Sequence, residues 1–216
     1  FCLSRGLGDV YKRQEDLLMT GKAHEANETT KRTPVANRKF KDTVFRMLFS
    51  DKEALLSLYN AINNSHYTDS SALEIVTLEN AIYMGMKNDL AFILDMNLYL
   101  YEHQSTMNPN IPLRDLFYIA AEYQKLVDKK SLYSSALQKI PNPHFIVFYN
   151  GSTPIDDCYT SRLSDAFYHV TDNPSLELIV TTFNVNAGHN TELMSHCQIL
   201  KEYSIYVAKV RSFAEQ

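Results

Sequence analysis

The sequence predicts an α/β fold in which a mixed central sheet is flanked by helices. Apolar runs of strand length occur at residues 90–94, 98–101, 145–149 and 176–183. Other segments have apolar residues at helical spacing, and these segments lie before, between and after the strand-like runs. Because strands and helices alternate along the chain, helices are expected to pack on the faces of the sheet.

The helical segments have recognisable stripes and ends. Phe40, Val44, Met47 and Leu48 form the first stripe, and Asp51 is expected to cap a second helix that ends at 63–65. A long helix follows Pro109 and Pro112. Its predicted apolar face is Leu113, Leu116, Phe117, Ala120, Tyr123 and Val127. The last stripe is Leu193, Cys197, Leu200, Tyr203, Val207 and Val210, with Asn190 or Thr191 as its cap.

Short β-rich runs at 73–78 and 81–84 precede a predicted hairpin at 90–101. The runs at 145–149 and 176–183 are typical of fully buried strands. Asn150-Gly151 is expected to form a turn after the first of them.

Length and composition fit one globular domain. The chain has 216 residues, of which 45% are hydrophobic and 21% charged. No apolar run approaches the ~20 residues that span a bilayer, and no secretory signal pattern occurs. The three cysteines, Cys2, Cys158 and Cys197, fit neither a disulfide framework nor a CxxC metal site. We therefore expect a cytoplasmic protein without membrane attachment.

The two ends of the chain differ from the rest. Residues 1–14 resemble translated sequencing-adapter sequence, and residues 15–37 are polar without a clear period. We expect 1–37 to be a non-native or disordered leader and 38–216 to be the folded domain. The last helical stripe reaches the final residues, so the natural protein is expected to continue beyond Gln216.

The hairpin carries acidic groups at its open end. Side chains alternate across a strand, so Glu102 and Gln104 share one face while Tyr101 and His103 share the other. If Ala91 lies opposite Leu100, the turn is Asp95-Met96 and Asp89 lies opposite Glu102. A slip of one residue would send Asp89 to the other face.

Two carboxylates at neighbouring positions repel each other unless a cation lies between them. Mg²⁺ accepts one or two carboxylates and keeps several waters, so Asp89 and Glu102 could hold it. An ordinary hairpin with polar ends explains the same spacing. A zinc site at His189, His196 and Cys197 is disfavoured, because the spacing fits no standard ligand set.

Several ordered motifs resemble the recombination-promoting nuclease family, a bacterial, transposase-like family within the PD-(D/E)XK nuclease superfamily. Asn88-Asp89 followed by Glu102-x-Gln104 is similar to the superfamily signature, with Gln in place of the usual Lys. The other motifs are Arg38–Asp42, Phe45–Phe49, Tyr101–Thr106, Phe148–Gly151 and Gly188–Asn190.

This resemblance implies a restriction-endonuclease-like core that hydrolyses DNA phosphodiester bonds. Asp89 and Glu102 would bind Mg²⁺ or Mn²⁺, and Gln104 would complete the catalytic set. Arg114 and Tyr118, one turn apart on the long helix, would face the open end of the hairpin, although plain surface placement fits them equally well. DNA is the implied partner, and a homodimer is a further expectation.

The charge balance permits DNA binding only if the basic residues are grouped on one part of the surface. The net charge of −4 is unusual for a nucleic-acid-binding protein. Clusters of basic residues are more often simply parts of the solvated surface. The DNA contacts that we expect are Lys39, Lys41, Arg114, Lys125, Lys129 and Lys130. Two other functions remain open: a DNA-binding recombination accessory protein that cleaves weakly or not at all, and a protein-interaction module.

Overall fold

The computed structural model describes residues 40–76, 90–169 and 171–214, and its centre is a six-stranded sheet of order β1-β2-β3-β4-β6-β5. β3–β4 and β4–β6 are parallel, and the other three pairs are antiparallel. The predicted mixed sheet is confirmed. The strands are β1 (Glu74–Val76), β2 (Leu90–Leu94), β3 (Asn97–Gln104), β4 (Asn142–Tyr149), β5 (Cys158–Arg162) and β6 (Ile179–Asn184).

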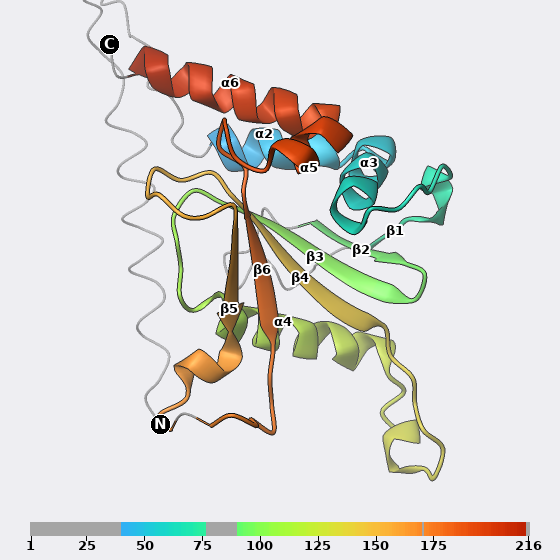
Figure 1. Cartoon of the computed structure of the whole chain (residues 1–216). Coiled ribbons are helices and arrows are strands. Elements are labelled where there is room, and N and C mark those ends of the chain that lie inside the picture. Colours follow the sequence, from blue (N-terminus) through green and yellow to red (C-terminus); the bar gives the residue numbers. More distant parts are fainter. Residues whose placement is uncertain (1–39, 77–89, 170, 215–216) are drawn as a thin grey trace, which may run out of the picture. The chain divides into compact units, whose positions relative to one another are not determined.

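Helices cover both faces of the sheet (Figure 1). One face carries α2 (Phe40–Phe49), α3 (Lys52–Asn63), α5 (Thr191–His196) and α6 (Gln198–Ala214), and the other carries α4 (Ile111–Leu126). Each face has its own hydrophobic core. The 3-10 turns are η1 (Ser70–Ala72), η3 (Ser131–Tyr133) and η4 (Leu163–Ala166).

Among the described helices, none is long and apolar enough to cross a membrane. The expected leader at 1–37 and strand at 81–84 lie outside the described residues.

The hairpin has the register that the metal hypothesis requires. Ala91 pairs with Leu100 and Ile93 with Leu98, which confirms the predicted turn at Asp95-Met96. Both turn residues have positive φ, 48° and 61°, the conformation of a two-residue turn whose twist matches that of the strands. Asp89 itself lies outside the described residues.

The two N-terminal helices follow the sequence closely, with one correction. The Asp51 carboxylate accepts a hydrogen bond from the Ala54 amide, and Asn64 ends α3 in the left-handed conformation, as predicted. In α2, however, Met47 is exposed, and the fully buried residues are Phe45 and Phe49. Val44 and Leu48 of the predicted stripe do pack against the core, so the buried face of α2 is turned toward Phe45 and Phe49 and away from Met47.

The predicted buried face of α4 is confirmed only in part: Leu116 and Tyr123 are half-buried against the core beneath the helix. Leu113 and Phe117 are exposed, and Ala120 is exposed as well. The buried positions of α4 are Ile111, Pro112, Asp115, Tyr118, Ile119 and Glu122. The helix thus turns two carboxyl groups inward and leaves apolar side chains outside. Apolar periodicity could not detect this arrangement, since it assumes that the polar face meets solvent.

Three further expectations needed correction. The strand expected at 176–183 begins at Ile179, and its residues alternate between fully buried and less buried because successive side chains point to opposite faces of the sheet. It pairs with the edge strand β5, which the sequence did not reveal. The last stripe is buried as predicted except for the half-buried Val210, but it belongs to two helices that break at Cys197. Asn190 begins α5 without a side-chain capping bond.

Candidate functional site

Glu102 and Gln104 lie on the face of β3 that α4 covers. Leu98 and Leu100, four and two residues before Glu102, pack into the core beneath α4, so strand alternation places Glu102 on the same side of β3. The Gln104 Nε2 donates a hydrogen bond to Glu102 Oε1 at 2.8 Å. The predicted sharing of a face by Glu102 and Gln104 is confirmed.

The first turns of α4 bring two further charged groups to Glu102. Arg114 Nη2 lies 3.5 Å from Glu102 Oε1, so the predicted approach of Arg114 to the hairpin is confirmed. Asp115 is buried, and Tyr118 one turn later packs in the same core. Sequence reasoning missed Asp115, whose only signal was its helical spacing from the buried Ile111, Tyr118 and Ile119.

The carboxyl groups of this site are held in an environment that disfavours their charge. Burial raises the pKa of Glu102, and the neighbouring Arg114 opposes that shift. Burial, followed by the charge of Glu102, raises the pKa of Asp115 to about 8. A low-dielectric site with two coupled carboxyl groups is stabilised by a cation, which restores the ionised forms. We call Glu102, Gln104, Arg114 and Asp115 the carboxylate site.

Within 40–76, 90–169 and 171–214, no three His, Cys, Asp or Glu side chains are arranged to hold a metal ion. Asp89, the second expected ligand, is outside these ranges. Cavities of about 790 and 490 Å³ lie elsewhere, and neither is lined by Glu102 or Gln104. The smaller one lies over α3, and the larger one lies between α4, β4 and β6.

The expected DNA contacts are distributed unevenly. Lys125 forms an ion pair with the buried Glu122 at 2.9 Å, and Lys129 and Lys130 are exposed just after α4. Lys41 belongs to α2, on the opposite side of the sheet, where burial and the nearby Arg211 lower its pKa. Lys41 therefore does not join the carboxylate site, and Lys39 lies outside the described residues.

A buried polar chain lies behind the site, on the other face of β3. His103 Nδ1 is 2.7 Å from Asp42 Oδ1, and His103 Nε2 is 2.7 Å from the Tyr203 hydroxyl. Burial lowers the pKa of His103, so we assign a neutral imidazole that donates from Nδ1 and accepts at Nε2. These contacts fix β3 between α2 and α6. The sequence placed His103 on this face but did not reveal its partners.

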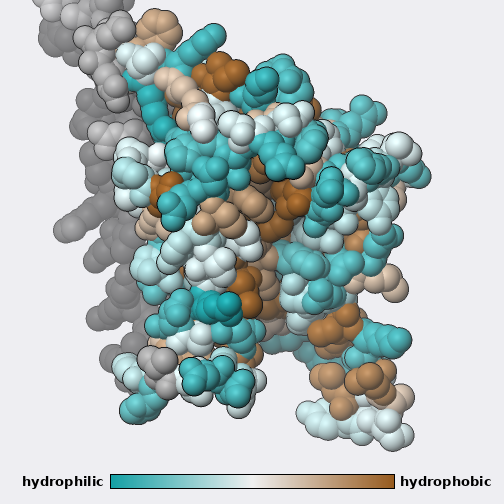
Figure 2. Space-filling model, viewed as in Figure 1, coloured by the Kyte–Doolittle hydropathy of each residue, from teal (hydrophilic) through white to brown (hydrophobic). Residues whose placement is uncertain are grey.

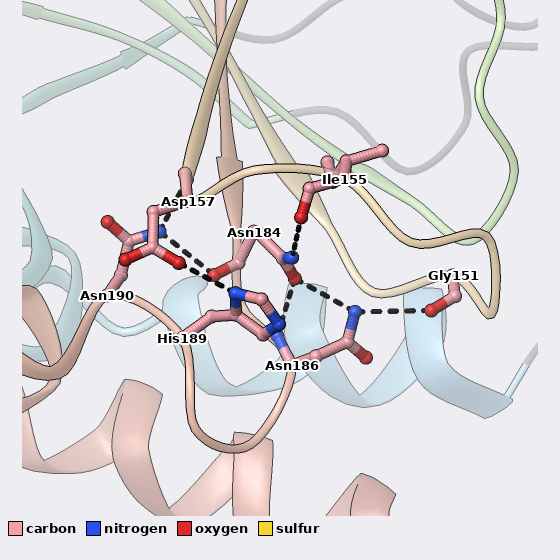
Figure 3. Close-up of polar contacts among 7 residues, drawn as sticks. All are labelled: Gly151, Ile155, Asp157, Asn184, Asn186, His189 and Asn190. Carbon is pink, nitrogen blue, oxygen red and sulfur yellow. Dashed lines mark hydrogen bonds and ion pairs between the residues drawn. The ribbon is translucent and has the colours of Figure 1, made fainter.

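Two of the motifs that resemble the nuclease family join the loops at the carboxyl ends of β4 and β6 (Figure 3). The Asn190 amide donates to the carbonyls of Asp157 and Asn184, at 2.6 and 3.0 Å. His189 Nδ1 lies 2.6 Å from Asp157 Oδ1, a contact that lowers the pKa of Asp157. His189 is thus held by Asp157, whereas Cys197 is buried in the core.

The other motif, Phe148–Gly151, has a comparable structural explanation. Arg211 of α6 donates to the backbone and side-chain oxygens of Asn150, which ties the end of β4 to the last helix. Any side chain at Gly151 would overlap the phenol ring of the buried Tyr149. Packing explains Gly151, and hydrogen bonds from Arg211 explain the oxygens of Asn150, whereas the buried Asn150 Nδ2 has no hydrogen-bond partner among the described residues.

No family model matches the chain, and neither a curated protein nor a solved structure is significantly similar to it.

Proposed function

We propose that this chain is a metal-dependent DNA endonuclease with a restriction-endonuclease-like core. The observation that carries the proposal is the partly buried carboxylate of Glu102, which is held by Gln104 and Arg114 on the central strand β3. A carboxylate that is largely removed from water, with a raised pKa and a charged partner, is typical of functional sites.

The chemistry of the donors fits a hard divalent cation. Asp89 and Glu102 would hold Mg²⁺ or Mn²⁺ through their oxygens, and Asp115 adds a carboxyl group within electrostatic reach of Glu102. When bound, such an ion lowers the pKa of a coordinated water and offsets charge on the phosphate in the transition state. The hairpin register supports Asp89 as the partner of Glu102, because Leu90 pairs with Tyr101.

The side chains of the site have separable roles in this proposal. Gln104 orients the Glu102 carboxylate through its 2.8 Å hydrogen bond, but it supplies no positive charge. Arg114 supplies that charge from α4, 3.5 Å from the same oxygen. We infer that Arg114 compensates for the Lys that the superfamily signature has at the position of Gln104, and that it faces the scissile phosphate.

The experiment is cleavage of supercoiled plasmid with Mg²⁺ or Mn²⁺ by the full chain. Glu102→Gln and Asp89→Asn keep the shape of the side chain and remove one negative charge. Each should lower the cleavage rate by about a hundredfold or more, because the metal contributes several kcal/mol of transition-state stabilisation.

The matched control is Glu53→Gln, an exposed glutamate of α3 on the opposite side of the sheet, which should cleave like the wild type. Wild-type cleavage no faster than that of Asp89→Asn would reject the enzyme. DNA binding without cleavage would then favour the accessory protein, an alternative that the missing Lys at position 104 also suggests.

A further inference from the structure

The connection between α4 and β4, residues 127–141, is an ordered projection; we call it the α4–β4 loop. Figure 1 shows it extending beyond the end of the sheet. Asp128 organises it: its carboxylate accepts hydrogen bonds from the Lys130 amide at 3.1 Å and from Ser131 Oγ at 2.6 Å. At the base of the loop, the Tyr123 hydroxyl donates to the Pro141 carbonyl at 2.7 Å.

This loop exposes large apolar side chains at its tip. Tyr133 is 94% exposed and Leu137 is 89% exposed, and Leu132 and Ile140 are also exposed. Figure 2 shows the corresponding apolar surface on the projecting part of the molecule. An exposed apolar cluster on an internally hydrogen-bonded loop marks an interaction surface, since leaving it in water costs free energy.

The charges of the loop favour an anionic partner. Lys129, Lys130 and Lys139 are exposed, whereas Asp128 is the loop's one acidic residue and is already occupied by its hydrogen bonds. Two such loops facing each other across a symmetric dimer would bring like charges together, which disfavours a second copy as the partner. An aromatic tip surrounded by lysines fits nucleic acid, whose bases stack on tyrosine while its phosphates attract ammonium groups.

We propose that the α4–β4 loop is a second DNA-binding element, in which Tyr133 and Leu137 contact bases and the three lysines contact phosphates. The inference rests on the proposed function, because it takes DNA as the partner. α4 connects the carboxylate site with the loop. Arg114 near the start of the helix contacts Glu102, and the loop begins at Val127, about 20 Å further along the helix axis. That distance corresponds to roughly six base pairs of duplex, so one DNA molecule can reach both.

The test is binding of the full chain to a fluorescent single-stranded oligonucleotide and to its duplex, measured by anisotropy in EDTA so that no cleavage occurs. The double variant Tyr133→Ser/Leu137→Ser should bind about tenfold more weakly or worse, because stacking of one base contributes about 1–3 kcal/mol. The variant Lys129→Gln/Lys130→Gln/Lys139→Gln should lose affinity and also bind with a smaller dependence on salt.

The matched control is Tyr168→Ser, which removes a fully exposed tyrosine from a segment outside the loop and should bind DNA like the wild type. Thermal unfolding of each variant checks that the fold is kept. Wild-type plasmid cleavage is measured in parallel, so the two proposals separate: loop-dependent binding without cleavage supports the loop and rejects the endonuclease.

Equal binding by the wild type and both loop variants would overturn the inference, whether or not the wild type cleaves. If the wild type binds no DNA, the inference fails as well. In that case, loop-dependent binding to anionic phospholipid vesicles would identify a membrane surface, and loop-dependent self-association in sedimentation would identify a second copy.

Discussion

Asp115 is a carboxyl group at a position of α4 where an apolar side chain would pack better. It is 5% exposed, and the charge of Glu102 adds to the effect of burial, so its pKa is about 8. An acid whose pKa is higher in the folded state binds more protons folded than unfolded. Stability conferred by the protonated form is therefore lost as the pH rises through the folded pKa.

This shift predicts how stability depends on pH in the metal-free protein. Between pH 3.8 and about 8, Asp115 should lower the free energy of unfolding by at most about 1.4 kcal/mol per pH unit. Asp115→Asn should remove this contribution and be more stable than the wild type at pH 8. Urea denaturation of both proteins at several pH values measures this difference in the free energy of unfolding. Parallel pH profiles of the wild type and Asp115→Asn would contradict the prediction.

In the proposed endonuclease, Gln104 and Arg114 would divide the role that one lysine fills in the superfamily signature. Gln104→Lys should keep or raise plasmid cleavage, because it restores a positive charge beside Glu102. Arg114→Gln should lower cleavage by on the order of tenfold or more, and Gln104→Lys should partly rescue that loss. The measurement is the cleavage rate of both single variants and the double variant. Independent effects without rescue would show that the two residues do not share one function.

At the scale of elements, β3 is held from both sides. One face contacts α4 through Glu102 and Arg114, and the other contacts α2 and α6 through His103. His103 lies between Glu102 and Gln104 in the sequence, so any shift of the imidazole displaces the strand that carries the carboxylate site. We therefore regard His103, Asp42 and Tyr203 as positioning residues.

Removing the Tyr203 hydroxyl should weaken this support. Tyr203→Phe leaves the buried His103 Nε2 without its 2.7 Å partner, at a cost of about 1–3 kcal/mol in the free energy of unfolding. The urea midpoint should fall while the m-value stays constant. Tyr168→Phe, which changes an exposed tyrosine in the same way, is the control and should have no effect. An unchanged midpoint in Tyr203→Phe would mean that the contact adds nothing to stability.

The hairpin turn offers a prediction of increased rather than decreased stability. Met96 is 81% exposed and has φ 61°, a conformation that costs a side chain about 1 kcal/mol and glycine almost nothing. Met96→Gly should raise the free energy of unfolding by about 0.5–1 kcal/mol relative to Met96→Ala. Thermal or urea unfolding measures the difference, and a less stable glycine variant would contradict the explanation.

At the scale of the molecule, several basic residues lie on α4 and in the loop that follows it. Arg114 lies at the carboxylate site, and Lys129, Lys130 and Lys139 lie in the α4–β4 loop, although the whole chain has a net charge of −4. DNA bound along this side would meet positive charge locally.

DNA binding should consequently depend steeply on salt. About four phosphate contacts predict roughly a hundredfold loss of affinity between 50 and 200 mM monovalent salt. Anisotropy titrations in EDTA measure the slope, and they should show the same slope for Glu53→Gln, which alters charge on the opposite side of the sheet. Affinity independent of salt would contradict a phosphate-directed surface.

The sequence by itself determined the local features. Asp51 caps α3 because a carboxylate can reach an amide three residues ahead, and the two-residue turn at Asp95-Met96 follows once Ala91 pairs with Leu100. Side chains alternate between the two faces of each strand with a period of two. The sharing of one face by Glu102 and Gln104 follows from the same period. Each of these features depends on neighbours in the chain, which a sequence shows directly.

Only the tertiary structure decided which side chains meet across long separations. The inward rotation of α4 was hidden because both faces of that helix carry apolar residues, and the buried Asp115 is accommodated beside Glu102 and Arg114. His103 meets Tyr203 from 100 positions away. Such contacts depend on the order of strands in the sheet and on which helix covers each face. Burial and electrostatics over the whole fold set that arrangement, and local periodicity does not contain it.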